Sequence, residues 1–193
     1  MSSKESTRLE LIYELIYEKI APHQDIYQSD TMARGHVIES IVKELYKGRN
    51  IVSTGFIKRT DNPFIGISPD GVELQQVGET KQGDIIIRHA VEVKGPLGKN
   101  FVKYWLEDKI PSEYFWQVIH YFLVIETLET LDFIIHNPEP YDDMVRTKTI
   151  RVTRLELQKY IMEAEVAICD FQGEYEIALK KFVLNVVEHS KKQ

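Results

Sequence analysis

The sequence predicts an α/β or α+β fold in which a mixed central sheet is flanked by helices. Apolar residues recur at helical spacing near both ends of the chain, whereas its middle holds short Ile- and Val-rich runs bounded by Gly, Pro and Asp. Helical segments before, between and after the strands are typical of a sheet with helices on its faces. At 193 residues the chain is long enough for one sizeable core and short for two, so we expect a single domain over residues 1–193.

The N-terminal part is predicted to hold two helices. Apolar residues from Leu9 to Ile20 recur at helical spacing, and the amphipathic helix that they form should end before Pro22. A loop follows, and the next helix should end near Gly48, which is a suitable C-cap.

Strand-like segments fill the middle of the chain. They are Ile51–Arg59, which Gly55 breaks, Phe64–Ile67, Val72–Val77 and Asp84–Lys94. The polar segment Gly78–Gly83 has turn composition, so the last two strands should form an antiparallel hairpin. If Gly78 lies opposite Asp84, the same register puts Asp70 opposite Glu92.

The second half of the chain again alternates between helix and strand. We expect a short helix or loop at Phe101–Asp108, a helix at Pro111–Thr127, strands at Leu131–His136 and Thr147–Thr153, and a long helix from Leu155. Pro111 suits the first turn of a helix, where its missing N–H group would have no partner. Gly173 is a candidate interruption of the long helix.

Three ionisable side chains should meet at the open end of the hairpin. Asp70 lies in the turn Ser68–Gly71, and strand alternation puts Glu92 and Lys94 on one face. Two carboxylates form a site for a hard cation such as Mg²⁺, and a lysine beside it can hold or help deprotonate a metal-bound water. A surface hairpin with scattered charges is the alternative, but Glu and Lys are costly in a strand this apolar unless they are paired.

The composition narrows the classes of function. The one cysteine, Cys169, excludes a disulfide framework and a Cys-based zinc or iron–sulfur site, and it fits a reducing, cytoplasmic setting. The apolar runs are too short to span a membrane, and the N-terminus is too polar for a secretory signal. A formal net charge of −6 argues against a protein coated in basic residues, although it allows a local basic lining. Candidates for that lining are Lys58, Arg59, Lys94, Lys99, Lys103 and Lys109.

The SPDG turn, followed by a strand that ends in VEVKGP, resembles the signature of the PD-(D/E)xK nuclease superfamily. Three further pieces resemble the lambda exonuclease, or YqaJ-type viral recombinase, family within it. They are Met32-Ala33-Arg34-Gly35 with Glu39 on the following helix, Ile110-Pro111-Ser112-Glu113-Tyr114 leading to Gln117 and Tyr121, and Asp132-Phe133-Ile134 leading to Asn137-Pro138. The resemblance runs from about Thr31 to about Pro140 and implies a restriction-endonuclease-like core.

The resemblance also implies roles for the hairpin residues and a reaction. Asp70, Glu92 and the Val93 carbonyl would hold Mg²⁺ or Mn²⁺, with Glu39 completing the metal site, and Lys94 would position the attacking water. The implied reaction is the 5′-to-3′ hydrolysis of linear double-stranded DNA in phage-type recombination, together with a single-strand annealing protein. The best-known member is a ring-shaped trimer, so we expect a homo-oligomer, encoded by a phage or its bacterial host.

Three residues outside the hairpin are candidates for contacts with DNA. Arg34 lies near the start of the second helix, where a guanidinium and exposed backbone N–H groups suit a phosphate. Gln117 and Tyr121 lie one helical turn apart and would face the substrate backbone or the metal-site carboxylates. His120 beside them is expected to be a packing residue.

Two other functions stay open from the sequence. A DNA endonuclease of the same superfamily would share Asp70, Glu92 and Lys94 but would need a base-reading element, for which no insertion is evident. A catalytically idle nucleic-acid-binding relative would not need Asp70, Glu92 and Lys94 together. The first helix lacks the Arg- and Ser-containing segment with which relatives grip a 5′ phosphate, so the polarity of digestion is also open.

Overall fold

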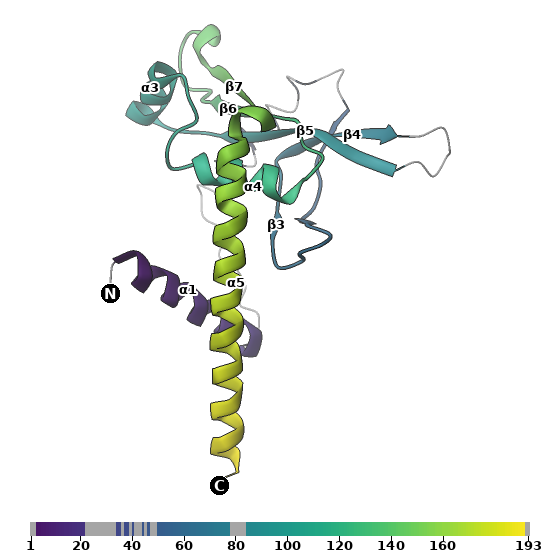
Figure 1. The fold of residues 1–193 in the computed structure, drawn as a ribbon. Coiled ribbons are helices and arrows are strands. Elements are labelled where there is room, and N and C mark those ends of the chain that lie inside the picture. The colour runs from purple at the N-terminus through teal and green to yellow at the C-terminus, as the bar shows by residue number, and fades with distance from the viewer. Residues whose placement is uncertain are drawn as a thin grey trace. The chain divides into compact units, whose positions relative to one another are not determined.

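The computed structural model describes residues 3–21, 50–77 and 84–191, together with residues 34, 35, 37, 38, 40, 44 and 46 (Figure 1). The chain divides into two compact units, one of residues 1–27 and 165–193 and one of residues 28–164. The expectation of a single domain over residues 1–193 stays a prediction.

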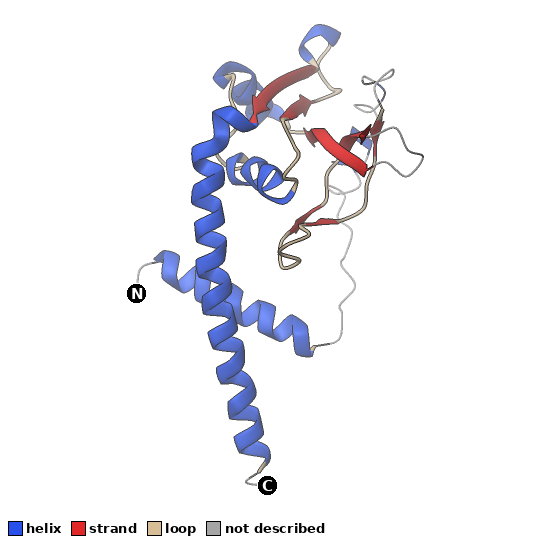
Figure 2. Ribbon diagram, turned by 45° about the vertical axis from the view of Figure 1, so that its right-hand side comes forward, coloured by secondary structure: helices blue, strands red, loops and turns tan. Residues whose placement is uncertain are grey.

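The larger unit is built on a five-stranded sheet with the order β1-β4-β5-β6-β7 (Figure 2). Its strands are β1 (Ile51–Val52), β4 (Gly71–Val77), β5 (Asp84–Lys94), β6 (Thr130–His136) and β7 (Thr147–Thr153). Strands β5 and β6 run parallel and the other neighbours run antiparallel, so the predicted mixed sheet is confirmed. Strands β2 (Ile57–Lys58) and β3 (Gly66–Ile67) pair separately, so the predicted strand Ile51–Arg59 is divided between two sheets.

The β4–β5 hairpin has a different register at its turn from the one predicted. Val77, not Gly78, is the partner of Asp84, so the prediction there is wrong by one residue. A bulge opposite the Glu73–Leu74 step corrects the offset, because Arg88 is one extra residue on β5.

Beyond the bulge, the hairpin has the register that the sequence predicted for its open end. Gly71 pairs with Val91. Continuing that register by one residue brings Asp70 level with Glu92. Two changes of one residue, at the turn and at the bulge, therefore cancel before the strands reach the ionisable side chains.

Helices pack on both faces of this part of the sheet. Helix α4 (Phe115–Val124) covers the face that carries Glu92, and most of its last seven residues are buried. On the other face, Ile38 from the helical residues near position 38 packs on Val91, Val93 and Ile134. Helix α3 (Gly98–Glu107) follows β5. Of the two predictions for Phe101–Asp108, a short helix or a loop, the helix is confirmed.

Helix α4 begins four residues later than predicted. The N–H group of Tyr114 donates to the carbonyl of Pro111 at 2.9 Å, which closes a turn before the helix. Pro111 therefore lies in this turn and not, as predicted, in the first turn of the helix.

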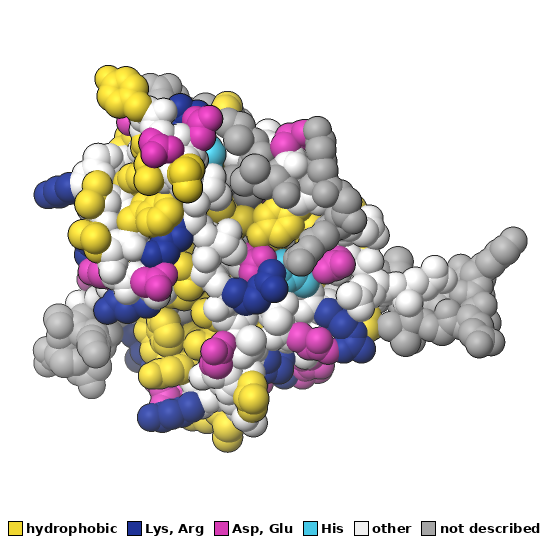
Figure 3. Space-filling view, turned by 90° about the horizontal axis from the view of Figure 1, so that it is seen from above, with side chains coloured by type: hydrophobic (Ala, Val, Ile, Leu, Met, Phe, Trp, Pro, Cys, Tyr) yellow, Lys and Arg dark blue, Asp and Glu magenta, His cyan; other side chains and the backbone are white. Residues whose placement is uncertain are grey.

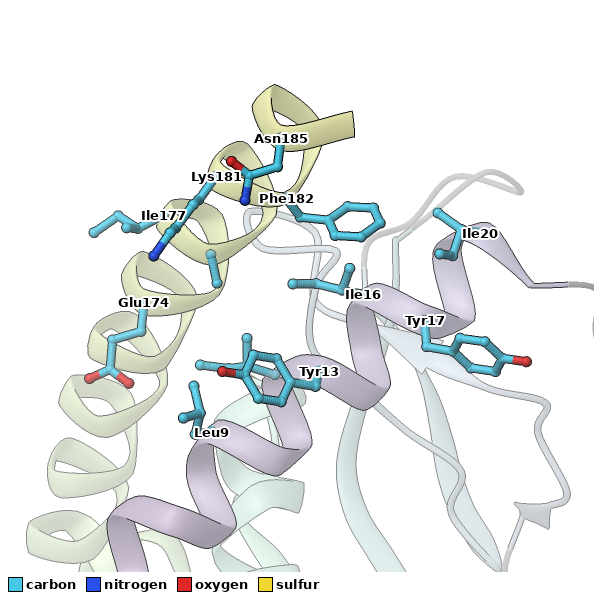
Figure 4. A pocket seen from close by; sticks show the side chains of 12 residues that line it. Leu9, Tyr13, Ile16, Tyr17, Ile20, Glu174, Ile177, Lys181, Phe182 and Asn185 are labelled. Carbon is cyan, nitrogen blue, oxygen red and sulfur yellow. The ribbon is translucent and has the colours of Figure 1, made fainter. Parts of the chain in front are cut away.

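The smaller unit pairs α1 (Ser3–Ile20) with the C-terminal part of α5 (Arg154–Ser190). Ile12, Ile16 and Tyr175 form its buried cluster. Figure 4 shows the groove of about 630 Å³ between the two helices, and its lining is mostly apolar, with Glu174 and Lys181 at one side. Helix α5 continues through Gly173, so the expected interruption there is wrong. Among the described helices, none is long and apolar enough to cross a membrane.

Gly95, directly after β5, lets the helical residues near position 38 approach the sheet closely. A methyl group on its Cα would overlap Ile38 Cδ1 and would lie 3.3 Å from Arg34 Nη1. Glycine therefore leaves the Ile38 side chain room here, beside the last strand residue of the hairpin.

An ion pair between a buried aspartate and a half-exposed arginine joins β6 to β7 on the face that Ile38 covers. Asp132, 2% exposed, accepts hydrogen bonds from Arg151 Nε at 2.6 Å and Nη2 at 2.8 Å, and from the Tyr46 hydroxyl at 2.9 Å. His89 Nε2 lies 3.4 Å from the same carboxylate. Burial raises the pKa of Asp132, but the hydrogen bonds from Arg151 and Tyr46, together with the neighbouring His89 ring, outweigh it and hold that pKa well below its ordinary value.

Gly95→Ala should lower the free energy of unfolding by about 1–3 kcal/mol, because the added methyl group must displace Ile38. Gly173→Ala is the matched control, since nothing lies within 4 Å of a methyl group there. Inside a helix that change should be neutral or stabilising by up to about 1 kcal/mol. Urea unfolding of both variants checks the contrast, and equal effects would contradict the close packing at Gly95.

Asp132→Asn should lower the free energy of unfolding by about 2 kcal/mol at pH 7, because Arg151 loses its charge partner. A lowered carboxyl pKa stabilises the folded state above the ordinary Asp value of about 3.9, and that effect is lost as the pH falls through the folded-state pKa. Urea unfolding should therefore show a constant difference from pH 7 to about 4.5 and a smaller one below. A difference that already changes near neutral pH would contradict the assignment of the effect to the Asp132 carboxyl.

Candidate active site

Asp70 reaches the site from the loop that follows β3. Pro69 before it is buried and Asp70 itself is half-buried. Asp70 Oδ2 accepts a hydrogen bond from the N–H group of Val93 at 2.7 Å. Because Val93 stands between Glu92 and Lys94, this bond fixes the loop carboxylate against the strand that carries the other two groups.

Glu92 is a buried carboxylate, 2% exposed, on the α4 face of β5. The Gln117 side-chain amide donates to its Oε1 at 2.7 Å, and the Tyr121 hydroxyl donates to its Oε2. Lys94 forms an ion pair with Oε1. A buried charge is stable only when it is paired and hydrogen-bonded, and here both oxygens are.

The Tyr121 hydroxyl lies near both carboxylates. Burial raises its pKa most strongly, and the negative charges of Glu92 and then of Asp70 raise it further. The hydroxyl therefore keeps its proton and acts as a donor. The charges of both Glu92 and Asp70 thus act on this hydroxyl, and the sharing of one cation by the two carboxylates stays a prediction.

Lys94 lies between the Glu92 carboxylate and an aromatic ring. Its side chain is 23% exposed, and its Nζ pairs with Glu92. The ammonium also lies 5.0 Å from the centre of the Tyr114 ring. Sequence reasoning placed Tyr114 in a motif without assigning it a contact with the site, because the direction of its ring depends on the turn before α4.

Arg34 lies at the end of β5, next to the ionisable set. Its Nη1 donates to the Gly95 carbonyl at 2.6 Å, and its Nη2 lies 3.5 Å from Asn137 Oδ1 and 3.9 Å from Glu139 Oε1. These contacts orient the guanidinium at the strand end that holds Lys94.

The outcome for the remaining predicted residues is mixed. Gln117 and Tyr121 were predicted to face either the DNA backbone or the metal-site carboxylates. Both donate hydrogen bonds to Glu92. The His120 ring lies 3.0 Å, through Nε2, from the Gly66 carbonyl, which ties α4 to β3. Glu39 lies outside the described residues, and its place in the site stays a prediction, as does the Val93 carbonyl as a ligand.

A family model, the YqaJ-like viral recombinase domain, matches residues 1–128. The chain belongs to this family. The predicted family is thereby confirmed.

Solved structures show the same fold. The crystal structure of an alkaline exonuclease, LHK-Exo, from Laribacter hongkongensis is 20% identical, with a TM-score of 0.76 over 94% of this chain and 86% of that chain. A crystal structure of LHK-Exo in complex with dAMP gives the same TM-score and coverage at 21% identity. The predicted fold class is confirmed by this likeness. A comparison with curated proteins finds no significant match.

The residues of this family member fit a hard divalent cation by their chemistry. Asp70, Glu92 and main-chain carbonyls offer oxygen atoms, which Mg²⁺ and Mn²⁺ prefer, and an ionised carboxylate has about four lone-pair sites. The bonds from Gln117 and Tyr121 to Glu92 therefore leave acceptor capacity. Within the described residues, no group of three or more His, Cys, Asp or Glu side chains gathers in one place.

One face of the molecule carries charges of both signs. Figure 3 shows one face of the molecule on which Lys and Arg side chains alternate with Asp and Glu, with hydrophobic side chains between them. Two candidates for a basic lining are already engaged, because Arg59 pairs with Asp61 at 2.7 Å and Lys103 lies 4.0 Å from Glu107.

Tyr121→Phe should lower the free energy of unfolding by about 1–3 kcal/mol, because it removes a donor from the buried Glu92. In a Glu92→Met background, Tyr121→Phe should lower the free energy of unfolding by less, since there is then no buried carboxylate to lose a hydrogen-bond donor. Tyr17→Phe, at a side chain that is 58% exposed, is the control and should have almost no effect. If Tyr121→Phe lowers the free energy of unfolding equally with and without Glu92→Met, the result contradicts the hydrogen bond between the two side chains.

Proposed function

We propose that this protein is a metal-dependent deoxyribonuclease that hydrolyses phosphodiester bonds in double-stranded DNA. The observation that carries the proposal is the hydrogen bond from Val93 to Asp70, which brings one carboxylate to the strand that holds Glu92 and Lys94. Membership of the YqaJ-like recombinase family and the fold shared with an alkaline exonuclease support the same reaction.

The side chains divide the work of hydrolysis in this proposal. Asp70, Glu92 and the Val93 carbonyl hold Mg²⁺ or Mn²⁺, with Glu39 as a further ligand. When bound, the cation supplies a Lewis acid and lowers the pKa of a coordinated water. Gln117 and Tyr121 keep the Glu92 carboxylate in one orientation, which is the usual task of groups behind a metal ligand.

Two cationic side chains act on the substrate. Lys94 orients the attacking water with its ammonium and offsets the negative charge that grows on the phosphate oxygens in the transition state. Arg34, at the end of the same strand, binds a neighbouring phosphate through its guanidinium. The attacking water gives up a proton to solvent as its oxygen bonds to phosphorus, the bond from phosphorus to the leaving oxygen breaks, and that oxygen takes a proton from a second water.

The finer proposal is an exonuclease that digests linear duplex from 5′ to 3′, as a homo-oligomer, in recombination with a single-strand annealing protein. It is supported by the family and by the name of the exonuclease that shares the fold.

The test is digestion of linear and circular duplex DNA by the purified chain, with Mg²⁺, with Mn²⁺ and with chelator. Linear duplex with and without a 5′ phosphate, labelled at one end, reports polarity. We expect loss of linear DNA only, which chelator stops. Cleavage of the circle would replace the exonuclease with an endonuclease, and intact DNA with every divalent ion would remove the enzymatic proposal.

Asp70→Asn and Glu92→Gln should each lower the rate of digestion by about 100-fold or more, because each removes a negative ligand. Glu73→Gln is the matched control, since Glu73 lies on the same hairpin but pairs with His89, on the opposite face from Glu92. It should digest DNA at the wild-type rate. Rates that are equal in all three variants would contradict the assignment of the site.

A further inference from the structure

Tyr114 is placed to control the position of Lys94. The ammonium of Lys94 lies 5.0 Å from the centre of the Tyr114 ring, within the range of a cation–π attraction. Such attractions strengthen when the cation is shielded from water, and the Lys94 side chain is 23% exposed. Glu92 is the other charged partner of this ammonium.

The backbone of Tyr114 is fixed on both sides. Its N–H group donates to the Pro111 carbonyl at 2.9 Å, and its carbonyl accepts from the Val118 N–H group at 3.0 Å. Tyr114 is thus the residue that starts α4, the helix that also carries the donors to Glu92. The helix that sets the position of the Tyr114 Cα atom therefore also sets the positions of Gln117 and Tyr121, which donate to Glu92.

The ring of Tyr114 is fixed by two further elements. It meets Tyr104 of α3 edge-on at 6.3 Å and 80°, and it packs on Phe133 at 5.6 Å. Phe133 is the residue of β6 that pairs with Glu92. Contacts of this kind add to the burial of the rings and hold them at one angle.

We propose that Tyr114 is a positioning residue, whose ring face holds the Lys94 ammonium where the water and the phosphate need it. This inference rests on the proposed nuclease function. A lysine has a long, flexible stem and loses much rotamer freedom when it is held in one place. Glu92 draws the ammonium toward the carboxylates, and the ring provides a second, rigid contact on another side.

The contact between Tyr114 and Lys94 is made by the ring, because the distance of 5.0 Å runs from the ammonium to the ring centre. A phenylalanine would therefore keep the contact with Lys94, whereas a leucine would fill part of the space without a π-system.

The test compares Tyr114→Phe and Tyr114→Leu in the full chain, by kcat and KM on linear duplex with Mg²⁺. Tyr114→Leu should lower kcat about tenfold, with KM within about twofold of wild type, and Tyr114→Phe should match wild type. Tyr160→Leu is the matched control, since Tyr160 packs on Phe115 at 4.9 Å and not on Lys94. It should leave both constants unchanged.

Three outcomes would overturn the inference. A higher KM with unchanged kcat would make Tyr114 a contact for DNA. Equal losses in the Phe and Leu variants would assign the effect to the hydroxyl. A Leu variant that equals wild type would remove the role altogether.

A second measurement separates this inference from the proposed function. The free energy of unfolding of wild type, Tyr114→Leu, Lys94→Met and the double variant needs no activity, and contact between the two side chains predicts non-additive effects. Additive effects overturn the contact. An inactive wild type would instead overturn the nuclease proposal, and a fully active Lys94→Met variant would remove the role of Lys94 in it, whereas the contact itself is decided by this cycle alone.

Discussion

The candidate site depends on one hydrogen bond, from the backbone N–H group of Val93 to the carboxylate of Asp70. It joins a loop to the strand β5, so the loop carboxylate is held by the main chain rather than by another flexible side chain. Bonds between a backbone N–H group and an ionised acceptor are among the stronger ones in proteins. Since strand alternation already sends Glu92 and Lys94 to one face, this single bond is enough to add the third group to them.

The second constraint is the burial of Glu92, which α4 makes possible. A charge that is 2% exposed would be costly alone, and α4 brings an amide and a hydroxyl to its two oxygens from positions one helical turn apart. The rest of that face of α4 is apolar and buried against the sheet. Packing of the apolar residues thus fixes the distance at which Gln117 and Tyr121 meet the carboxylate.

The sequence was a good guide where periodicity and turn composition decide the structure. The bounds of β5 and β7 match the predictions at Asp84–Lys94 and Thr147–Thr153, because Ile-, Val- and Thr-rich runs end at polar or Gly-Pro segments. Asp70 was also expected level with Glu92. That expectation began from the wrong partner for Asp84, and the offset disappeared only because Arg88 forms a bulge, which no Gly or Pro in the sequence announces.

The features that the sequence did not predict correctly depend on tertiary contacts. A glycine in a helix costs about 1 kcal/mol, yet α5 continues through Gly173, where Phe171 and Tyr175 on either side pack with α1. The ring of Tyr114 faces Lys94 because of the turn at Pro111 and the position of Phe133, which belong to different segments of the chain. Contacts made by three elements together leave no periodic signal in any one of them.

The net charge of −6 is compatible with a DNA substrate because the charge is not uniform. Strands β5 and β6 are parallel, so their C-terminal ends share one edge of the sheet, which holds Lys94 and, through the Gly95 carbonyl, Arg34. Burial lowers the pKa of His136 at the end of β6, and the charges of Arg146 and Arg34 lower it further, as nearby cations do. Cationic side chains gathered at this edge would attract phosphates even though the net charge of the chain is negative.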